Sequence, residues 1–168
     1  VTGGLRYTMD RTKATGATRQ LFFSGPNQYV ALCAADGTLA TTLSSCNRSS
    51  VQKSEKPTWL INVDYKPTED VLLYAKYSRG YRQGNINVSN TTPQGWGPEK
   101  VDAYELGAKA TIRGPLYGYL NFAAFYNDFS DQQLSASLLP APGSTASPAQ
   151  AIINAGKSKI QGIEIEGR

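Results

Sequence analysis

The sequence predicts an all-β protein whose antiparallel, up-and-down strands form part of a membrane-spanning barrel. Three observations support this fold class: apolar and polar residues alternate strictly, the apolar rows end in aromatic residues, and short turns alternate with long breaks. Strict alternation places successive side chains on opposite faces of an extended strand. Aromatic residues at the ends of an apolar row are typical of strands that cross a bilayer, because their rings settle where hydrocarbon meets water.

The first strands expected along the chain are Leu5–Thr12 and Thr58–Lys66. In the second, Trp59, Ile61, Val63 and Tyr65 fall on one face and polar residues on the other. A tight turn at 66–70 then leads into Val71–Tyr81. The break at 13–54 is rich in Gly, Ala, Ser and Thr. Breaks longer than about 15 residues are uncommon in compact soluble domains, whereas outer-membrane barrels carry long loops at their outer end.

The remaining strands repeat this arrangement. Val101–Ile112 has an unbroken apolar row from Tyr104 to Ile112, and the short turn at 113–115 joins it to Leu116–Ser130. Breaks at 82–100 and 131–153 precede Val101–Ile112 and the last strand, Gly156–Gly167. Antiparallel strands connected in this order place every long loop at one end. We therefore expect part of a transmembrane outer-membrane β-barrel with short periplasmic turns and long extracellular loops.

Composition agrees with this class. Charged residues make up 18% of the 168 residues, below the roughly 25% of soluble domains, and ten Tyr and sixteen Gly suit strands better than helices. The net charge of +4 comes without a basic run, so we expect no nucleic-acid partner. No apolar run approaches the roughly 20 residues of a membrane-spanning helix. The chain opens without Met or a signal peptide and ends within an apparent strand, so we expect residues 1–168 to be a fragment.

Two cysteines, Cys33 and Cys46, lie in the first long break. The chain has no His, and two Cys alone cannot supply a four-ligand zinc site, so no metal site is expected. A disulfide that closes this loop would contribute about 3 kcal/mol in the chain-entropy model and would imply an oxidising compartment. Two unpaired thiols remain the alternative, because spacing alone cannot establish pairing.

No enzymatic constellation is present. Without His, neither a Ser-His-Asp nor a Cys-His arrangement can form, and no phosphate-binding or dinucleotide motif occurs. Glu164 and Glu166 lie two apart on one strand face, whereas glycosidase carboxylates flank the bond from opposite sides. We expect no catalytic residue and no cofactor.

Charged residues on the polar faces of the strands are expected to face the lumen. Because such lumens are plugged rather than open, we expect these residues to pair across strands and to contact whatever fills the lumen. A direct part in the substrate path is the alternative. The lumen-facing set is Arg6, Asp10, Asp64, Lys76, Glu105, Lys109, Glu164 and Glu166.

The best candidates for ligand contact lie in the loops, at the mouth of the barrel. Tyr81, Arg82, Gln83 and Trp96 bring aromatic and cationic groups to this end of the barrel. Aromatic faces stack on catecholates and other planar rings, and Arg pairs with anionic ligands. As an alternative, Tyr81 and Trp96 belong to the outer aromatic girdle.

Several segments in order resemble TonB-dependent outer-membrane receptors. They are GGLRYTMD, KPTEDVLLYAKYSRGYRQGNIN, PEKVDAYELGAKATI, YLNFAAFYNDFSDQQL and NAGKSKIQGIEIEG. The resemblance covers most of the chain apart from the long loops. It implies a barrel of about 22 strands around a plug domain, of which this chain would supply about six strands. The family's plug, its energy-coupling box and its terminal strand are not represented.

The resemblance also implies a function in the bacterial outer membrane. The family takes up scarce nutrient complexes, most commonly ferric siderophores, and a TonB-type energy transducer acts through the plug region. The expected partners are therefore outer-membrane lipid, a ferric siderophore or similar complex, and that transducer. Two alternatives are a passive porin-like barrel and a secreted soluble β-domain that binds carbohydrate.

Overall fold

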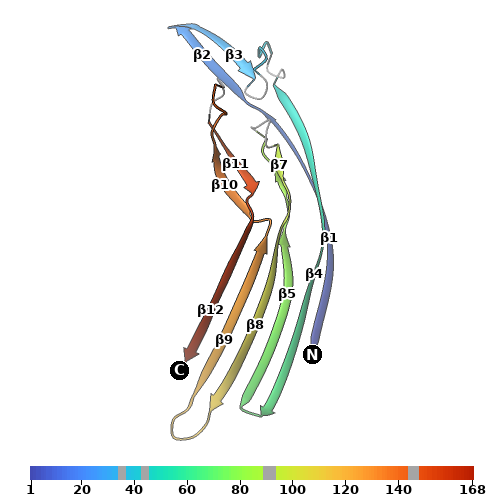
Figure 1. Cartoon of the computed structure of the whole chain (residues 1–168), viewed down its shortest axis with the longest axis vertical. Helices are drawn as coiled ribbons and strands as arrows, with labels where there is room; N and C mark the ends of the chain where they lie inside the picture. The colour runs from blue at the N-terminus through green and yellow to red at the C-terminus, as the bar shows by residue number, and fades with distance from the viewer. Residues whose placement is uncertain (34–36, 43–45, 89–93, 144–147) are drawn as a thin grey trace.

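The computed structural model describes residues 1–33, 37–42, 46–88, 94–143 and 148–168. In these residues all regular structure is β-strand, and no helix could cross a membrane. Six of the described strands form one antiparallel sheet in the order β1-β4-β5-β8-β9-β12 (Figure 1). Their bounds are β1 Thr2–Ala17, β4 Asn47–Thr68, β5 Val71–Arg82, β8 Glu99–Ile112, β9 Gly118–Ser130 and β12 Lys157–Gly167. The expected all-β, up-and-down fold is confirmed.

Short and long connections separate to opposite ends of the sheet (Figure 1). The β4–β5 and β8–β9 turns lie at one end, here called the short-turn end. The other end, the long-loop end, carries three two-stranded hairpins, and each of the three long connections also contains residues outside the described ones. The hairpins pair β2 Arg19–Gly25 with β3 Gln28–Cys33, β6 Asn85–Ile86 with β7 Gly95–Trp96, and β10 Gln133–Leu138 with β11 Ala149–Asn154.

The strands extend further into the expected breaks than the sequence pattern indicated. The β1–β4 pairing runs without a register shift from Thr2↔Asn62 to Ala17↔Asn47. The prediction of an irregular segment over all of residues 13–54 is therefore wrong. Small and polar residues dominate both strands there, so no apolar row marked them. Backbone hydrogen bonds pair two strands whether or not their side chains alternate in polarity.

The sheet has one apolar and one polar face. Within the described residues no second layer covers the apolar face, and the polar face is covered only at the long-loop end, where the β6–β7 segment packs against β1 and β4. Leu106 is 63% exposed, Ile163 67% and Phe122 41%. The buried hydrophobic residues of the described chain, Cys33, Cys46, Ile86 and Ala151, all belong to the long-loop end. A sheet with exposed apolar side chains along its length fits a bilayer, where lipid replaces a protein core.

Aromatic side chains form a row across four adjacent strands on the apolar face. The Trp59 and Tyr77 ring centroids lie 6.4 Å apart, those of Tyr77 and Tyr104 4.8 Å, and those of Tyr104 and Tyr126 6.3 Å. The Arg79 guanidinium stacks 4.5 Å from the Trp59 ring centroid on the long-loop side of this row. The row therefore marks the edge of the apolar band toward the long loops.

Candidate functional site

Strand register places the eight charged residues expected to face the lumen on one face of the sheet. The register carries this polar face from strand to strand, and its residues lie on the side of the sheet away from the apolar row. Examples are the pairs Asp64↔Tyr74, Lys76↔Glu105, Lys109↔Asn121 and Glu166↔Asn121. Arg6 and Asp10 occupy the same face of β1.

An ion-pair cluster occupies the middle of this polar face. Lys76 Nζ pairs with Glu105 across β5 and β8, and the Tyr74 hydroxyl donates a hydrogen bond of 2.7 Å to the same carboxylate. Lys109 Nζ lies 5.9 Å from the Tyr74 ring centroid. At the short-turn end, Glu166 accepts hydrogen bonds of 3.2 Å from Tyr119 and Asn121. These contacts hold neighbouring strands together.

A cavity of about 420 Å³ opens where β4 and β5 separate. Their pairing extends to Trp59↔Arg79, and beyond that point the Tyr81 hydroxyl reaches across to donate to the Asp10 carboxylate of β1. Its lining is Arg6, Thr8, Asp10, Thr58, Arg79, Gly80, Tyr81 and Gln83. The fold thus brings together two expected ligand-contact residues and two expected lumen residues that are far apart in the sequence.

Arg82 has partners within the chain. Its Nη2 lies 2.7 Å from Glu99 Oε2, and the same carboxylate oxygen accepts a 2.6 Å hydrogen bond from the Gln133 backbone N–H. The Gln133 side-chain amide in turn donates to the carbonyls of Gln83 at 2.9 Å and Gly97 at 3.1 Å. Arg82 therefore joins β5, β8 and the start of β10.

Trp96 lies in the β6–β7 hairpin, paired with Asn85, and is separate from the cavity residues. Its indole Nε1 is buried, with no hydrogen-bond partner among the described residues. Close packing against this hairpin explains why residue 84 is a glycine, because a Cβ on Gly84 would collide with the Trp96 carbonyl oxygen. The hairpin is therefore held tightly against the end of β5.

Side-chain amides that sequence reasoning missed join the loops to each other. The Asn154 amide accepts from the Gly97 N–H at 2.7 Å and donates to the Gly97 carbonyl at 3.1 Å and the Asp131 carbonyl at 2.7 Å. The Asn87 amide makes two 3.2 Å hydrogen bonds to the backbone of Ile152. Asn in a turn-rich segment carries no signal for these contacts, because each depends on a strand far away in sequence.

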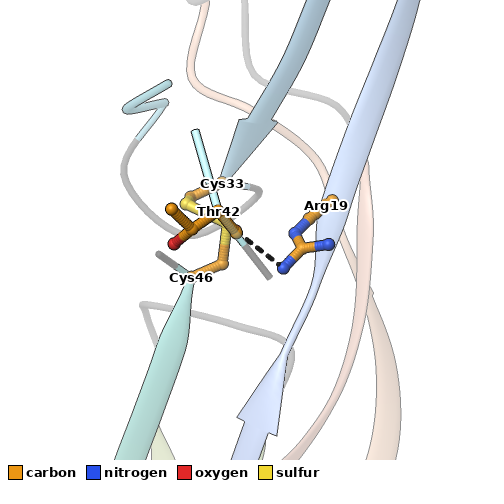
Figure 2. The surroundings of a disulfide bond; sticks show 4 residues. All are labelled: Arg19, Cys33, Thr42 and Cys46. Atoms are coloured by element: carbon orange, nitrogen blue, oxygen red, sulfur yellow. Dashed lines mark hydrogen bonds between the residues drawn. A yellow bond between two sulfur atoms is a disulfide. The ribbon is translucent and has the colours of Figure 1, made fainter. Parts of the chain in front are cut away.

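A disulfide closes the first long connection (Figure 2). It joins Cys33 at the end of β3 to Cys46 just before β4, with the two Cα atoms 5.2 Å apart. Arg19 Nη2 donates a 3.0 Å hydrogen bond to the Thr42 carbonyl beside it. The disulfide attaches the β2–β3 hairpin to the start of β4, and the Arg19 hydrogen bond attaches β2 to Thr42 in the connection between β3 and β4. Among the described residues, no group of three or more Cys, Asp or Glu side chains could hold a metal ion.

Comparison with known proteins identifies the family. The family model for the TonB-dependent receptor-like β-barrel matches residues 1–168. Among solved structures, the chain resembles a double mutant of the Serratia marcescens hemophore receptor HasR in complex with its hemophore HasA and heme. That similarity has a TM-score of 0.60 at 18% identity and covers 98% of this chain.

The chain spans 28% of the length of the HasR chain, and at this identity the similarity shows the fold alone. No curated protein matches the chain. The family consists of outer-membrane receptors and transporters and is not an enzyme family. Its barrel carries short periplasmic turns and long extracellular loops, which correspond to the short-turn and long-loop ends of this sheet. The chain belongs to the TonB-dependent receptor β-barrel family.

Proposed function

We propose that the receptor to which this chain belongs imports a nutrient complex, namely a ferric siderophore, by energised transport across the outer membrane. The observation that carries the proposal is the family match over all 168 residues. On this proposal the polar face lines the lumen, and a TonB-type transducer acts through a plug that lies outside the matched barrel region. The receptor performs no covalent chemistry.

The cavity beside Tyr81 supports a ligand of mixed aromatic and anionic character. Arg6 lies at its wall with no ion-pair partner among the described residues, and Tyr81 and Gln83 supply an aromatic ring and an amide. Ferric catecholate siderophores combine aromatic rings with net negative charge, which suits stacking and Arg pairing. HasR binds a hemophore and heme, so heme is the competing ligand class.

Uptake by the full-length receptor tests the proposal. The receptor is expressed in a host that lacks its own iron receptors, and entry of iron-55 is followed from ferric catecholate, ferric hydroxamate and heme. We expect siderophore uptake that stops when the transducer is deleted or the proton gradient is collapsed. Uptake that survives both treatments would indicate a passive barrel, and uptake of heme alone would overturn the siderophore assignment.

The site itself is tested by Tyr81→Ala and Gln83→Ala. Each should raise the half-saturating ligand concentration about tenfold, the effect of losing roughly 1.4 kcal/mol of contact energy, with little change in maximal uptake. Arg113→Gln at a periplasmic turn, where Arg113 pairs with Asp70 at 2.7 Å, is the control and should leave ligand affinity unchanged.

A further inference from the structure

The end of β5 is held on one side only where it passes the cavity. Its backbone pairing with β4 stops at Arg79, whereas its pairing with β8 continues to Arg82. The two cavity residues Tyr81 and Gln83 lie in or just after this last part of β5. Among the described residues this stretch has no backbone ladder to β4, so its position depends on contacts from other elements.

The chain just beyond β5 packs closely against two of those elements. The Gly84 N–H donates a 3.2 Å hydrogen bond to the buried Ser54 hydroxyl of β4, and a Cβ on Gly84 would collide with the Trp96 carbonyl oxygen. This approach brings the carbonyls of Gln83 and Gly97 to one place, where both accept from the same donor. Carbonyl oxygens brought together in this way stay unsatisfied unless such a donor joins them.

The side-chain amide of Gln133, the first residue of β10, is that donor. Its Nε2 donates to the Gln83 carbonyl at 2.9 Å and to the Gly97 carbonyl at 3.1 Å, and the Arg82 carbonyl lies 3.4 Å from the same nitrogen. An amide nitrogen offers two N–H donors, so these carbonyls share both of them. One side chain thus joins the end of β5 to the residue that follows β7.

The backbone at the start of β10 is itself fixed. The Glu99 carboxylate accepts a 2.6 Å hydrogen bond from the Gln133 N–H and pairs with Arg82 Nη2 at 2.7 Å, and its side chain is only 12% exposed. Just before Gln133 the chain turns at Asp131, where φ is 56°, and the Asp131 carbonyl accepts from the Asn154 amide at 2.7 Å. Gln133 therefore reaches the end of β5 from a backbone held on both sides.

We propose that Gln133, held by Glu99, is a positioning residue for ligand binding, because its amide fixes the backbone from which Tyr81 and Gln83 face the cavity. Neither Gln133 nor Glu99 lines the cavity, so each acts on a ligand only through the end of β5. This inference rests on the proposed function, since it takes the cavity as the ligand site. Without the amide the cavity wall is less ordered, and the ligand has to order it on binding.

Equilibrium binding by the purified full-length receptor in neutral detergent micelles tests this. The probes are a ferric catecholate, a ferric hydroxamate and heme, each labelled with iron-55. Gln133→Leu keeps the side-chain size and removes the donor, so it should raise the Kd of the bound probe about tenfold. Gln133→Lys keeps a donor at this place and should stay within about threefold of the wild type.

Gln132→Leu is the matched control, because it makes the same change one position earlier. In the described residues only the backbone of Gln132 is hydrogen-bonded, to Gly156 and Ala155. Its Kd should equal that of the wild type. An equal loss of affinity in Gln132→Leu and Gln133→Leu, or in Gln133→Lys and Gln133→Leu, would overturn the positioning role.

A double variant separates positioning from a general loss of stability. If Gln133 acts through the segment that carries Gln83, the two substitutions are coupled, and Gln133→Leu should raise Kd at most about threefold once Gln83 is replaced by Ala. A full tenfold effect in that background would contradict the proposal. Glu99→Gln is the second variant should Gln133→Leu not fold: it should raise Kd about threefold, and an unchanged Kd would overturn the role.

The outcomes also separate this inference from the proposed function. A wild type that binds none of the probes, or Tyr81→Ala and Gln83→Ala variants with unchanged Kd, would overturn both. Affinity lost in those two variants but kept in Gln133→Leu would overturn the positioning role alone. Binding of heme alone, with the expected ranking of the Gln133 variants, would overturn the siderophore assignment and support the positioning role.

Discussion

Individual side chains on the polar face hold the strands in register by filling spaces left by glycine. The Tyr74 ring covers Gly107 on the neighbouring strand, where any Cβ would collide with it. The Phe125 ring covers Gly162 in the same way, with a Cβ reaching within 2.7 Å of the ring. Each ring contributes packing that the open polar face otherwise lacks. The position of the Tyr74 ring also lets its hydroxyl donate a hydrogen bond to Glu105.

Substituting Gly107 with Ala tests the packing at the residue scale. The added methyl must displace the Tyr74 ring, so we expect the free energy of unfolding of the full-length receptor to fall by about 1–3 kcal/mol, the usual cost of overpacking. Urea unfolding of the folded receptor in micelles measures this. Gly4→Ala is the control, since nothing lies within 4 Å of its Cβ position. If both substitutions lower the free energy of unfolding equally, the packing of the Tyr74 ring does not depend on a glycine at position 107.

At the scale of elements, the hairpins at the long-loop end form a connected unit. Asn154 links β11 to β7, Asn87 links the β6–β7 segment to Ile152, and Gln133 links β10 to the end of β5. Amide side chains can do this because each offers a donor and an acceptor to a backbone edge. The β10–β11 hairpin therefore lies beside β7 without a continuous backbone ladder (Figure 1).

Asn154→Ala should loosen this unit. The substitution removes three hydrogen bonds, and backbone amides near Gly95–Trp96 should exchange with deuterium about tenfold faster, corresponding to roughly 1.4 kcal/mol less protection. Hydrogen exchange of the full-length receptor followed by mass spectrometry measures the change. Ser137→Ala is the matched control, because the 2.6 Å hydrogen bond that Ser137 accepts from Gln150 stays within one hairpin. Unchanged exchange in Asn154→Ala would show that the hairpins are held independently.

At the scale of the whole molecule, the sheet is open. Within the described residues β1 and β12 are edge strands, each paired on one side only, by β4 and β9 respectively. Unpaired strand edges are tolerated poorly in water and not at all in hydrocarbon, and a closed barrel removes them. The exposed apolar face adds to this cost, since water has to solvate residues such as Leu106 and Ile163.

The 168 residues expressed alone should therefore not fold stably in aqueous buffer. We expect no cooperative transition in urea and a strong tendency to associate through the edges of β1 and β12. Circular dichroism and light scattering across a denaturant series measure both, with the full-length receptor in micelles as the control that does unfold cooperatively. A monodisperse segment with a sharp transition would contradict this expectation.

Much of the fold followed from local pattern. The apolar rows at Trp59–Tyr65 and Tyr104–Ile112 predicted strands with one lipid-facing side, and the order of short and long connections predicted their up-and-down arrangement. The hairpins in the long connections were not predicted, because their pairing depends on backbone hydrogen bonds rather than on alternation. The candidate site could be predicted only in part. Tyr81 contacts Asp10 because β4 and β5 separate beyond Trp59↔Arg79, and no local pattern indicates that separation.

The sequence by itself determined which side of each strand is apolar, because the period of two is built into the covalent geometry of an extended chain. Only the tertiary structure decided which residues of different strands became neighbours. Register depends on hydrogen bonds between segments far apart in the chain, and it brought Arg11, Lys53 and Lys159 to one edge of the apolar band although no basic run joins them.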